Sequence, residues 1–291
     1  MTSPTRCLLF AALLAAPVAA HAGSLRDFFL GKRDIEVITN TEMTPAGRLR
    51  PAASKDAPQY YLAISAGFRD FGGTIAGITE PPSQDVVKAL SAALAKRGYL
   101  PATDQSPPPT LVLFFTWGTL NPESFPGFDP DAPPQISNRQ QILRFLGAKS
   151  TGLDDSFLNP LTAPAVGLTA LNADARDLYE AAEEDFYVAV VSAYNLASVQ
   201  RKQRELLWTT RIASFGRGFD FPDVYPTMAA IGGAEFGRET QKPVWIRASE
   251  RYQPDIKLGE LQVVEHLQGA KLPVIEAPTA KQHQLAAPGK K

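Results

Sequence analysis

Cysteine and histidine are scarce in this chain, and their scarcity excludes several kinds of chemistry. One cysteine, Cys7, and three histidines occur among 291 residues. Cys7 lies in an amino-terminal segment that we expect to be removed, so the mature chain would have neither an internal disulfide nor a thiolate nucleophile. Only His266 and His283 would remain, without a His-Glu-x-x-His motif or a cysteine pair. We therefore expect no metal site and no cofactor.

Long apolar runs are missing after the first 22 residues. Those residues carry one positive charge, at Arg6, an apolar stretch from Cys7 to Ala20, and a small-x-small ending at 20–22. This layout is typical of a cleavable secretory signal, so we expect an exported chain, periplasmic or secreted, that starts near Gly23. A retained amino-terminal anchor is the alternative, whereas lipidation is disfavoured because the cysteine lies at the start of the apolar stretch. No later run predicts a membrane span.

An excess of one charge is missing too. Removal of the signal takes away one arginine, which leaves 28 Lys and Arg against 30 Asp and Glu, a net charge of −2 by subtraction. This balance gives no general attraction to nucleic acid or anionic lipid. We expect no nucleic-acid partner and no transmembrane segment in the mature chain, and the partner classes that remain are an envelope protein or a small ligand.

Composition divides the chain into four parts. We interpret residues 1–22 as the signal, 23–58 as an extended arm or linker, and 59–267 as a single domain with an insertion at about 121–182. Residues 268–291 lack aromatics and periodicity and are typical of a disordered tail. The 25 prolines predict that much of the chain is loop.

The domain opens with the order strand, helix, strand. Residues 59–67 alternate aromatic and β-branched side chains, as a strand requires. A helix is predicted over 83–98, with Ser83 as its cap and an apolar residue at every fourth position. Residues 110–120 form a short aromatic run between prolines, which indicates a central strand. The insertion then predicts helices at 138–147 and 172–185.

A hairpin and a further helix complete the domain. Alternation with a period of two over 186–194 and again over 208–214 predicts two strands joined by a basic connection. A helix with Pro226 in its first turn follows, and then strands at 243–249 and 259–267. The predicted fold class is α+β, with a mixed or antiparallel sheet, helices packed on one face, a helical or loop-rich insertion, and flexible amino- and carboxy-terminal segments.

Four residues of the hairpin carry a resemblance. Tyr194 and Asn195 end its first strand, and Leu207 with Trp208 opens its second. In this pattern the chain resembles a broad group of bacterial cell-envelope proteins of unknown function, whose small α/β domain is similar to that of peptidoglycan-synthase-activator lipoproteins and of lipid-transport auxiliary lipoproteins. The longer connection, Asn195 in place of a commoner Asp, and the missing lipobox depart from that group. The resemblance implies an accessory role in the envelope.

No catalytic motif is present. The chain lacks a Gly-x-Ser-x-Gly elbow and a Walker loop, and the glycines of 71–77 do not match the dinucleotide fingerprint. We therefore assign no catalytic residue, and we interpret His266 as an exposed strand-end residue. Clustered carboxylates leave a carboxylate-dependent hydrolase open as the alternative, although solvated loop charges explain them more simply. These carboxylates are Asp129, Asp131, Asp154, Asp155, Glu183, Glu184 and Asp185.

The most suggestive patch for binding is the loop at 214–226. Aromatic side chains surround a basic and two acidic ones there, just before a predicted helix whose free N–H groups could hold an anionic or sugar-like ligand. The alternative is an ordinary loop that covers the sheet edge. We predict a non-catalytic, exported binding or accessory protein of the envelope, with a purely structural secreted protein as a third possibility. The candidate ligand- or partner-binding residues are Arg217, Phe219, Asp220, Phe221, Asp223 and Tyr225.

Overall fold

The structure is a computed structural model that describes residues 34–74, 77–125, 135–153 and 172–251. All of these residues belong to one compact unit within Met1–Gln253. The strand predicted at 259–267 and the tail predicted at 268–291 lie outside the described residues. Within the described residues, no helix combines the length and the apolar character that crossing a bilayer requires.

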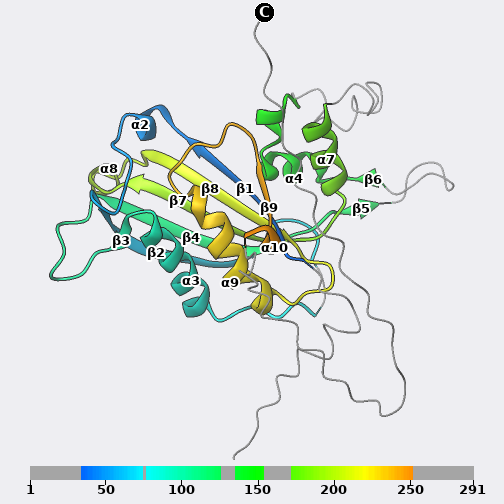
Figure 1. Ribbon diagram of the computed structural model, residues 1–291, viewed down its shortest axis with the longest axis horizontal. Helices are drawn as coiled ribbons and strands as arrows, with labels where there is room; N and C mark the ends of the chain where they lie inside the picture. Colours follow the sequence, from blue (N-terminus) through cyan, green and yellow to red (C-terminus); the bar gives the residue numbers. More distant parts are fainter. Residues whose placement is uncertain (1–33, 75–76, 126–134, 154–171, 252–291) are drawn as a thin grey trace, which may run out of the picture. The chain divides into compact units, whose positions relative to one another are not determined.

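A seven-stranded mixed sheet forms the centre of the fold, with strand order β3-β2-β4-β7-β8-β1-β9 (Figure 1). The pairs β2–β3 and β2–β4 are parallel, and the remaining pairs are antiparallel. This arrangement confirms the predicted α+β class with a mixed sheet. The strands are β1 Glu36–Met43, β2 Gln59–Asp70, β3 Tyr99–Pro101, β4 Leu111–Leu120, β7 Phe186–Asn195, β8 Leu206–Phe215 and β9 Val244–Arg247, with β5 Ser124–Phe125 and β6 Gln135–Ile136 forming a separate two-stranded ribbon.

Two longer helices cover one face of the sheet, α3 (Ser83–Lys96) and α9 (Phe221–Gly232). The predicted apolar stripe of α3 is buried at Val86, Leu90 and Leu94, because a spacing of four residues keeps side chains on one side of a helix. The predicted cap is wrong in detail. Pro82 occupies the cap position without a side-chain bond, and Ser83 is the first helical residue.

The insertion covers part of the opposite face with α4 (Arg139–Leu146) and α7 (Ala173–Ala181). Their buried residues pack with Ile38, Val188 and Ala213 of the sheet. Helices therefore lie on both faces rather than on one, because the insertion has an apolar side of its own to bury. The short helical segments are α2 Pro45–Arg48, η1 Ala148–Thr151, α8 Leu196–Gln200, η3 Gly233–Glu235 and α10 Ala248–Arg251.

Strand β1 differs from the expectation that residues 23–58 form an extended arm. It lies between β8 and β9 inside the sheet, antiparallel to both. Its composition hid it, because Thr39, Asn40 and Thr41 interrupt the apolar alternation although all three are buried. Buried hydroxyl and amide groups are acceptable only where they find hydrogen-bond partners. The partners come from segments far along the chain.

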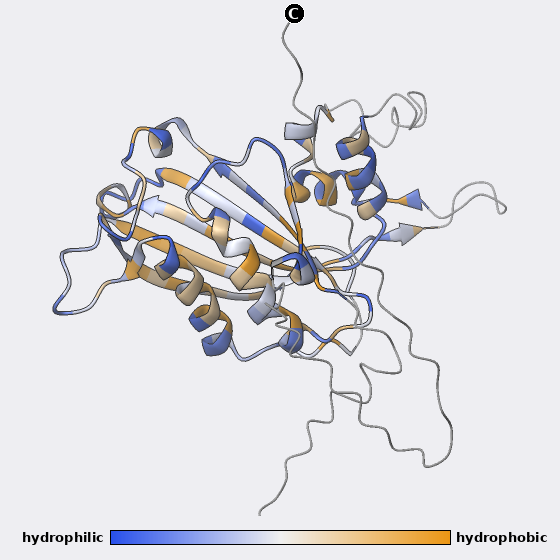
Figure 2. Ribbon diagram, in the orientation of Figure 1, coloured by the Kyte–Doolittle hydropathy of each residue, from blue (hydrophilic) through white to orange (hydrophobic). Residues whose placement is uncertain are grey.

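The hairpin β7–β8 confirms the predicted pair of strands, while the following helix begins earlier than predicted. Helix α9 starts at Phe221, so Pro226 lies inside it rather than in its first turn. Close contact between this helix and the sheet occurs at Gly232, where an added Cβ would lie 2.5 Å from Ile212 and 2.8 Å from Thr39 Oγ1. Figure 2 shows that β8 turns from apolar to polar in its middle, at Thr209–Arg211.

Candidate functional site

The aromatic residues of the predicted loop site belong to the core. Phe221 is fully buried, and its ring stacks on Tyr187 with centroids 4.6 Å apart and planes inclined by 3°. Phe219 and Tyr225 are half-buried against the same core, and the backbone carbonyl of Phe219 accepts a hydrogen bond from Tyr187 Oη. These rings therefore pack the start of α9 onto the sheet.

The charged residues of the same loop lie at the surface. Arg217 is exposed, and its Nη2 lies 3.1 Å from Glu184 Oε2. Asp220 occupies the cap position of α9 without a side-chain cap bond, and Asp223 is exposed in the first turn. The structure thus gathers the aromatic side chains in the core and leaves the charged ones in solvent. Ligand binding at this loop stays a prediction.

Three of the clustered carboxylates fall within the described residues, and two of these pair with arginines. Glu183 Oε1 accepts a hydrogen bond from Arg139 Nη2 at 2.9 Å, and Glu184 pairs with Arg217. The backbone carbonyl of Asp185 accepts from Gly216. No group of three His, Cys, Asp or Glu side chains within the described ranges is placed to hold a metal ion. The other predicted positions lie outside the described residues, namely Asp129, Asp131, Asp154, Asp155 and His266.

A different site is formed on the sheet face that carries α4 and α7, at the carboxyl end of α4. A cavity of about 740 Å³ lies there over strands β1 and β8, and we call it the polar cleft. Four chain segments far apart in the sequence contribute to it. Its lining residues are Asn40, Thr41, Glu42, Arg48, Arg144, Gly147, Lys149, Ser150, Arg211, Glu239, Thr240 and Gln241.

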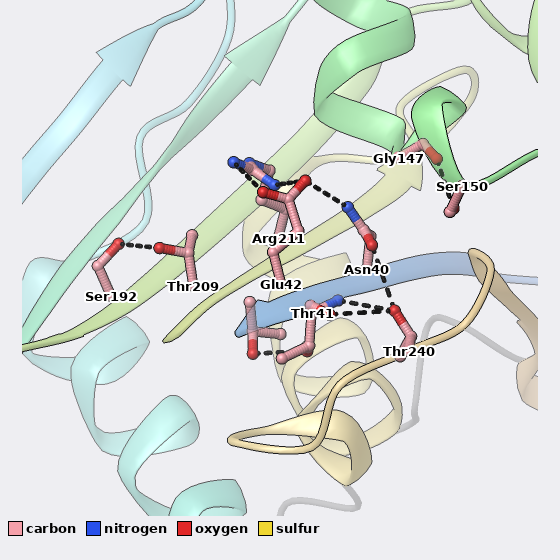
Figure 3. A network of polar contacts seen from close by, with 10 residues as sticks. Asn40, Thr41, Glu42, Gly147, Ser150, Ser192, Thr209, Arg211 and Thr240 are labelled. Atoms are coloured by element: carbon pink, nitrogen blue, oxygen red, sulfur yellow. Dashed lines mark hydrogen bonds and ion pairs between the residues drawn. The ribbon is translucent and has the colours of Figure 1, made fainter. Parts of the chain in front are cut away.

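Strand pairing places the central charges of the polar cleft. Asn40 is directly opposite Arg211 in the β1–β8 ladder, and Glu42 is opposite Thr209. Since side chains alternate along a strand, Asn40, Glu42 and Arg211 project from one face. Arg211 Nη1 lies 2.9 Å from Glu42 Oε1, and Asn40 Nδ2 is 3.5 Å from the same oxygen (Figure 3).

Asn40 is the buried anchor of this group. Only 3% of its surface is exposed, and its Oδ1 accepts a hydrogen bond from Thr240 Oγ1 at 3.2 Å. Gly147 ends α4 in the left-handed region, at φ 90°, and an added Cβ there would lie 2.7 Å from the Asn40 side chain. Glycine at this position thus allows the end of α4 to approach β1 closely.

A second hydrogen-bonded group fixes β1 from the other face. Thr41 Oγ1 donates to the carbonyl of Glu235 at 2.8 Å and lies 2.7 Å from Thr210 Oγ1. Because the single hydroxyl proton of Thr41 is used for Glu235, the hydroxyl of Thr210 donates to Thr41. The backbone N–H of Thr41 donates to Thr240 Oγ1 at 3.0 Å. These bonds hold the segment after η3 against β1.

An ion pair crosses one end of the polar cleft. Arg48 Nε donates to Glu239 Oε2 at 2.8 Å, and Arg48 Nη2 contacts Glu239 Oε1. This hydrogen bond lowers the pKa of Glu239 and raises that of Arg48. Thr44 caps the short helix that carries Arg48, because its Oγ1 accepts from the N–H of Gly47. Both side chains of the pair are half-exposed.

Among the described residues, the lining of the polar cleft includes four cationic and two anionic side chains. The cations are Arg48, Arg144, Lys149 and Arg211 and the anions are Glu42 and Glu239, so the lining that the structure describes sums to +2, whereas the chain as a whole has a net charge of −1. Guanidinium groups bind carboxylate and phosphate oxygens through two parallel hydrogen bonds. The amide and hydroxyl groups nearby both donate and accept. This arrangement suits an anionic ligand that also carries polar groups.

Comparisons with known proteins identify no family. No protein-family model and no curated protein matches the chain. Structural likeness is weak. A PDZ domain protein from Parabacteroides distasonis shares 9% identity at a TM-score of 0.34, over 77% of this chain, which spans 42% of that protein. The PelC dodecamer from Paraburkholderia phytofirmans has 8% sequence identity and a TM-score of 0.30, and the match covers 70% of this chain and 98% of that one. A DUF4136 family protein from Bacteroides thetaiotaomicron has 11% sequence identity and a TM-score of 0.31, and the match covers 70% of this chain and 97% of that one.

Sequence reasoning missed the polar cleft entirely. Asn40, Glu42 and Arg48 fall in the segment interpreted as an arm, and Arg211 was interpreted only as one position in an alternating strand. Their meeting depends on the pairing of β1 with β8, which are more than 160 residues apart. The one signal available was the run of polar residues within two β-rich stretches, Thr39–Glu42 and Thr209–Arg211.

Proposed function

We propose that this chain is a non-catalytic binding or accessory protein that holds an anionic ligand in the polar cleft. The observation that carries the proposal is the concentration of positive charge around the buried Asn40–Thr240 anchor. An anion bound here would contact Arg211 and Arg48 while Arg211 stays paired with Glu42 and Arg48 stays paired with Glu239. Binding would therefore not require either ion pair to break. The clefts that bind small ligands commonly have volumes of about 300–1,000 Å³, a range that includes this one.

We further propose that the protein acts in the cell envelope after export. The charged start, apolar stretch and small-x-small ending of residues 1–22 support this part of the proposal. Amino-terminal sequencing of the protein recovered from its own host should begin near Gly23. A chain recovered with residues 1–22 intact would contradict removal of the signal.

Binding can be tested by NMR titration of the isotopically labelled protein with galacturonate and with inorganic phosphate at low ionic strength. We expect saturable shifts at the backbone amides of Asn40, Ser150 and Thr240. Arg211→Ala should weaken the binding of both anions at least about tenfold, because it removes a charged hydrogen-bond donor from the floor of the cleft.

Arg217→Ala is a matched control. Arg217 is also an arginine in an ion pair with a glutamate, but it lies in the 214–226 loop rather than in the polar cleft. The proposal requires binding to survive Arg217→Ala. Shifts centred on residues 216–226, lost in Arg217→Ala and retained in Arg211→Ala, would instead support the loop site predicted from the sequence. Absence of any shift with either anion would overturn the proposal.

A further inference from the structure

Two more cavities adjoin the polar cleft and extend it along the structure. A cavity of about 290 Å³ shares Arg48 and Glu239 with the cleft. A third, of about 470 Å³, shares Arg50, Pro51 and Gln59 with the second. We call the row of three cavities, from Lys149 through the Arg48–Glu239 pair to Pro108, the trough. The three cavities therefore adjoin one another, and a ligand longer than the polar cleft would pass over the Arg48–Glu239 ion pair to reach the second cavity.

The trough crosses the ends of strands rather than following an edge. Met43 ends β1, Leu207 is near the start of β8, Leu111 starts β4, and Tyr99 and Gln59 start β3 and β2, and all five line the second cavity. An extended peptide binds by adding a strand to a sheet edge, where free backbone groups are aligned with its own. The trough offers no such alignment, which disfavours a peptide strand as its occupant.

Positive charge continues along the trough. Within the part of the chain that the structure describes, its lining includes six cationic side chains and two carboxylates. A row of separated cations suits a ligand that repeats its negative charge, because each repeat can meet its own partner and the binding free energies combine. The six are Arg48, Arg50, Arg144, Lys149, Arg211 and Arg238.

The two carboxylates select among polyanions. Glu42 and Glu239 can only accept hydrogen bonds when ionised, so a ligand that brings donors as well as negative charge suits this lining better than one that brings negative charge alone. Sugar hydroxyls are such donors, whereas a polyphosphate chain has none. The outer cavities are lined in part by Pro51, Pro107 and Pro108, whose ring surfaces match the C–H faces of sugar rings. Anion, donor and apolar face occur together in an acidic sugar.

We propose that the ligand is a linear acidic oligosaccharide that lies along the trough, an inference that rests on the proposed anion binding in the polar cleft. One acidic sugar unit occupies the cleft beside Arg211, and the following units pass over Arg48 toward Arg50. Galacturonate oligomers of one to six units provide a direct probe by isothermal titration calorimetry at low ionic strength. Affinity should rise roughly tenfold or more between one unit and three to four, then level off once the trough is filled.

Two variants distinguish the contributions of the two ends of the trough to binding. Arg50→Gln should remove most of the gain with length and leave the affinity for the single unit unchanged, because Arg50 lies outside the polar cleft. Arg211→Ala should weaken every length. Neutral maltohexaose should not bind. Melting temperatures close to that of the unmodified protein show that both variants are folded.

Each other outcome is decisive. Binding of the single unit with no gain in length overturns the oligosaccharide inference and leaves the anion proposal standing. If neither galacturonate nor phosphate binds, both are overturned. Polyglutamate or single-stranded DNA that binds as tightly as the galacturonate hexamer, with the same loss in Arg50→Gln, would also overturn the inference, because the trough would then select for charge alone.

Discussion

Gly147 connects the stability of the protein with the shape of its binding cleft. It ends α4 with a positive φ of 90°, and its missing side chain leaves room for Asn40, the buried anchor of the polar cleft. Any side chain at position 147 would strain the backbone and also push against the Asn40 amide. The sequence shows only a glycine after a helical pattern, which predicts the end of the helix but not the neighbour across the chain.

Gly147→Ala should therefore destabilise the protein by about 1–3 kcal/mol, measured by urea denaturation. Gly67→Ala is the matched control. Gly67 also has a positive φ, of 78°, but an added Cβ there would have no atom within 4 Å. Gly67→Ala should lose only the part of the unfolding free energy that comes from backbone strain, and it should still bind galacturonate. Equal losses of stability and equal binding in the two variants would show that the Asn40 contact is unimportant.

At the scale of elements, the sequence predicted those segments whose burial is conventional. The period of two in β7 and β8, the apolar run of β4 and the stripe of α3 each have one dominant pattern, and all four segments fold as expected. Strand β1 escaped prediction because its polar side chains are buried through Thr41–Thr210 and Asn40–Thr240 contacts. A local pattern cannot show partners that lie about 170 and 200 residues away.

The start of α7 provides a test of element stability. Asn172 caps this helix, with its Oδ1 accepting from the N–H of Ala175 at 2.8 Å, and its Nδ2 donates to the carbonyl of Thr151. Asn172→Ala should cost about 1–2 kcal/mol of unfolding free energy, because one helix N–H and one carbonyl lose their partners.

Asp220→Ala provides the comparison for α9. Asp220 occupies the same position at the start of that helix but makes no side-chain cap bond. Its replacement should change the free energy of unfolding by less than about 0.5 kcal/mol, as is usual for exposed positions. A larger loss in Asp220→Ala than in Asn172→Ala would contradict the assignment of the cap at α7.

For the whole molecule, the described ionisable groups predict how stability depends on pH. Hydrogen bonds from Asn195 and Ser198 lower the pKa of Glu205, and the bond from Arg48 lowers that of Glu239. Because the folded state holds these carboxylates ionised more strongly than the unfolded chain does, their contribution is present above the ordinary pKa of 4.5 and is lost as the pH falls below it. Both groups lie at the surface, so the acid effect is small and weakens with salt.

On the alkaline side, the burial of tyrosine hydroxyl groups predicts a loss of stability. Burial raises the pKa of Tyr99 to about 12, and it also raises those of Tyr61, Tyr187 and Tyr225 above the ordinary 10. An unfolded chain releases the Tyr99 proton near pH 10, whereas the folded protein retains it until about pH 12. The contribution of Tyr99 is therefore complete below pH 10 and is lost as the pH rises from 10 to 12.

Tyr99→Phe should remove about 2–3 kcal/mol of this alkaline loss, since each pKa unit corresponds to about 1.4 kcal/mol. Urea denaturation at intervals from pH 8 to 12 measures it, and the free energy of unfolding of the unmodified protein should fall by about 2–3 kcal/mol relative to that of the variant between pH 10 and 12. Tyr179→Phe serves as the control. Tyr179, on α7, lies beneath the guanidinium of Arg139, whereas Tyr99 lies in the core beside Trp208. If the unmodified protein and Tyr99→Phe lose stability in parallel between pH 10 and 12, another group must drive the alkaline unfolding.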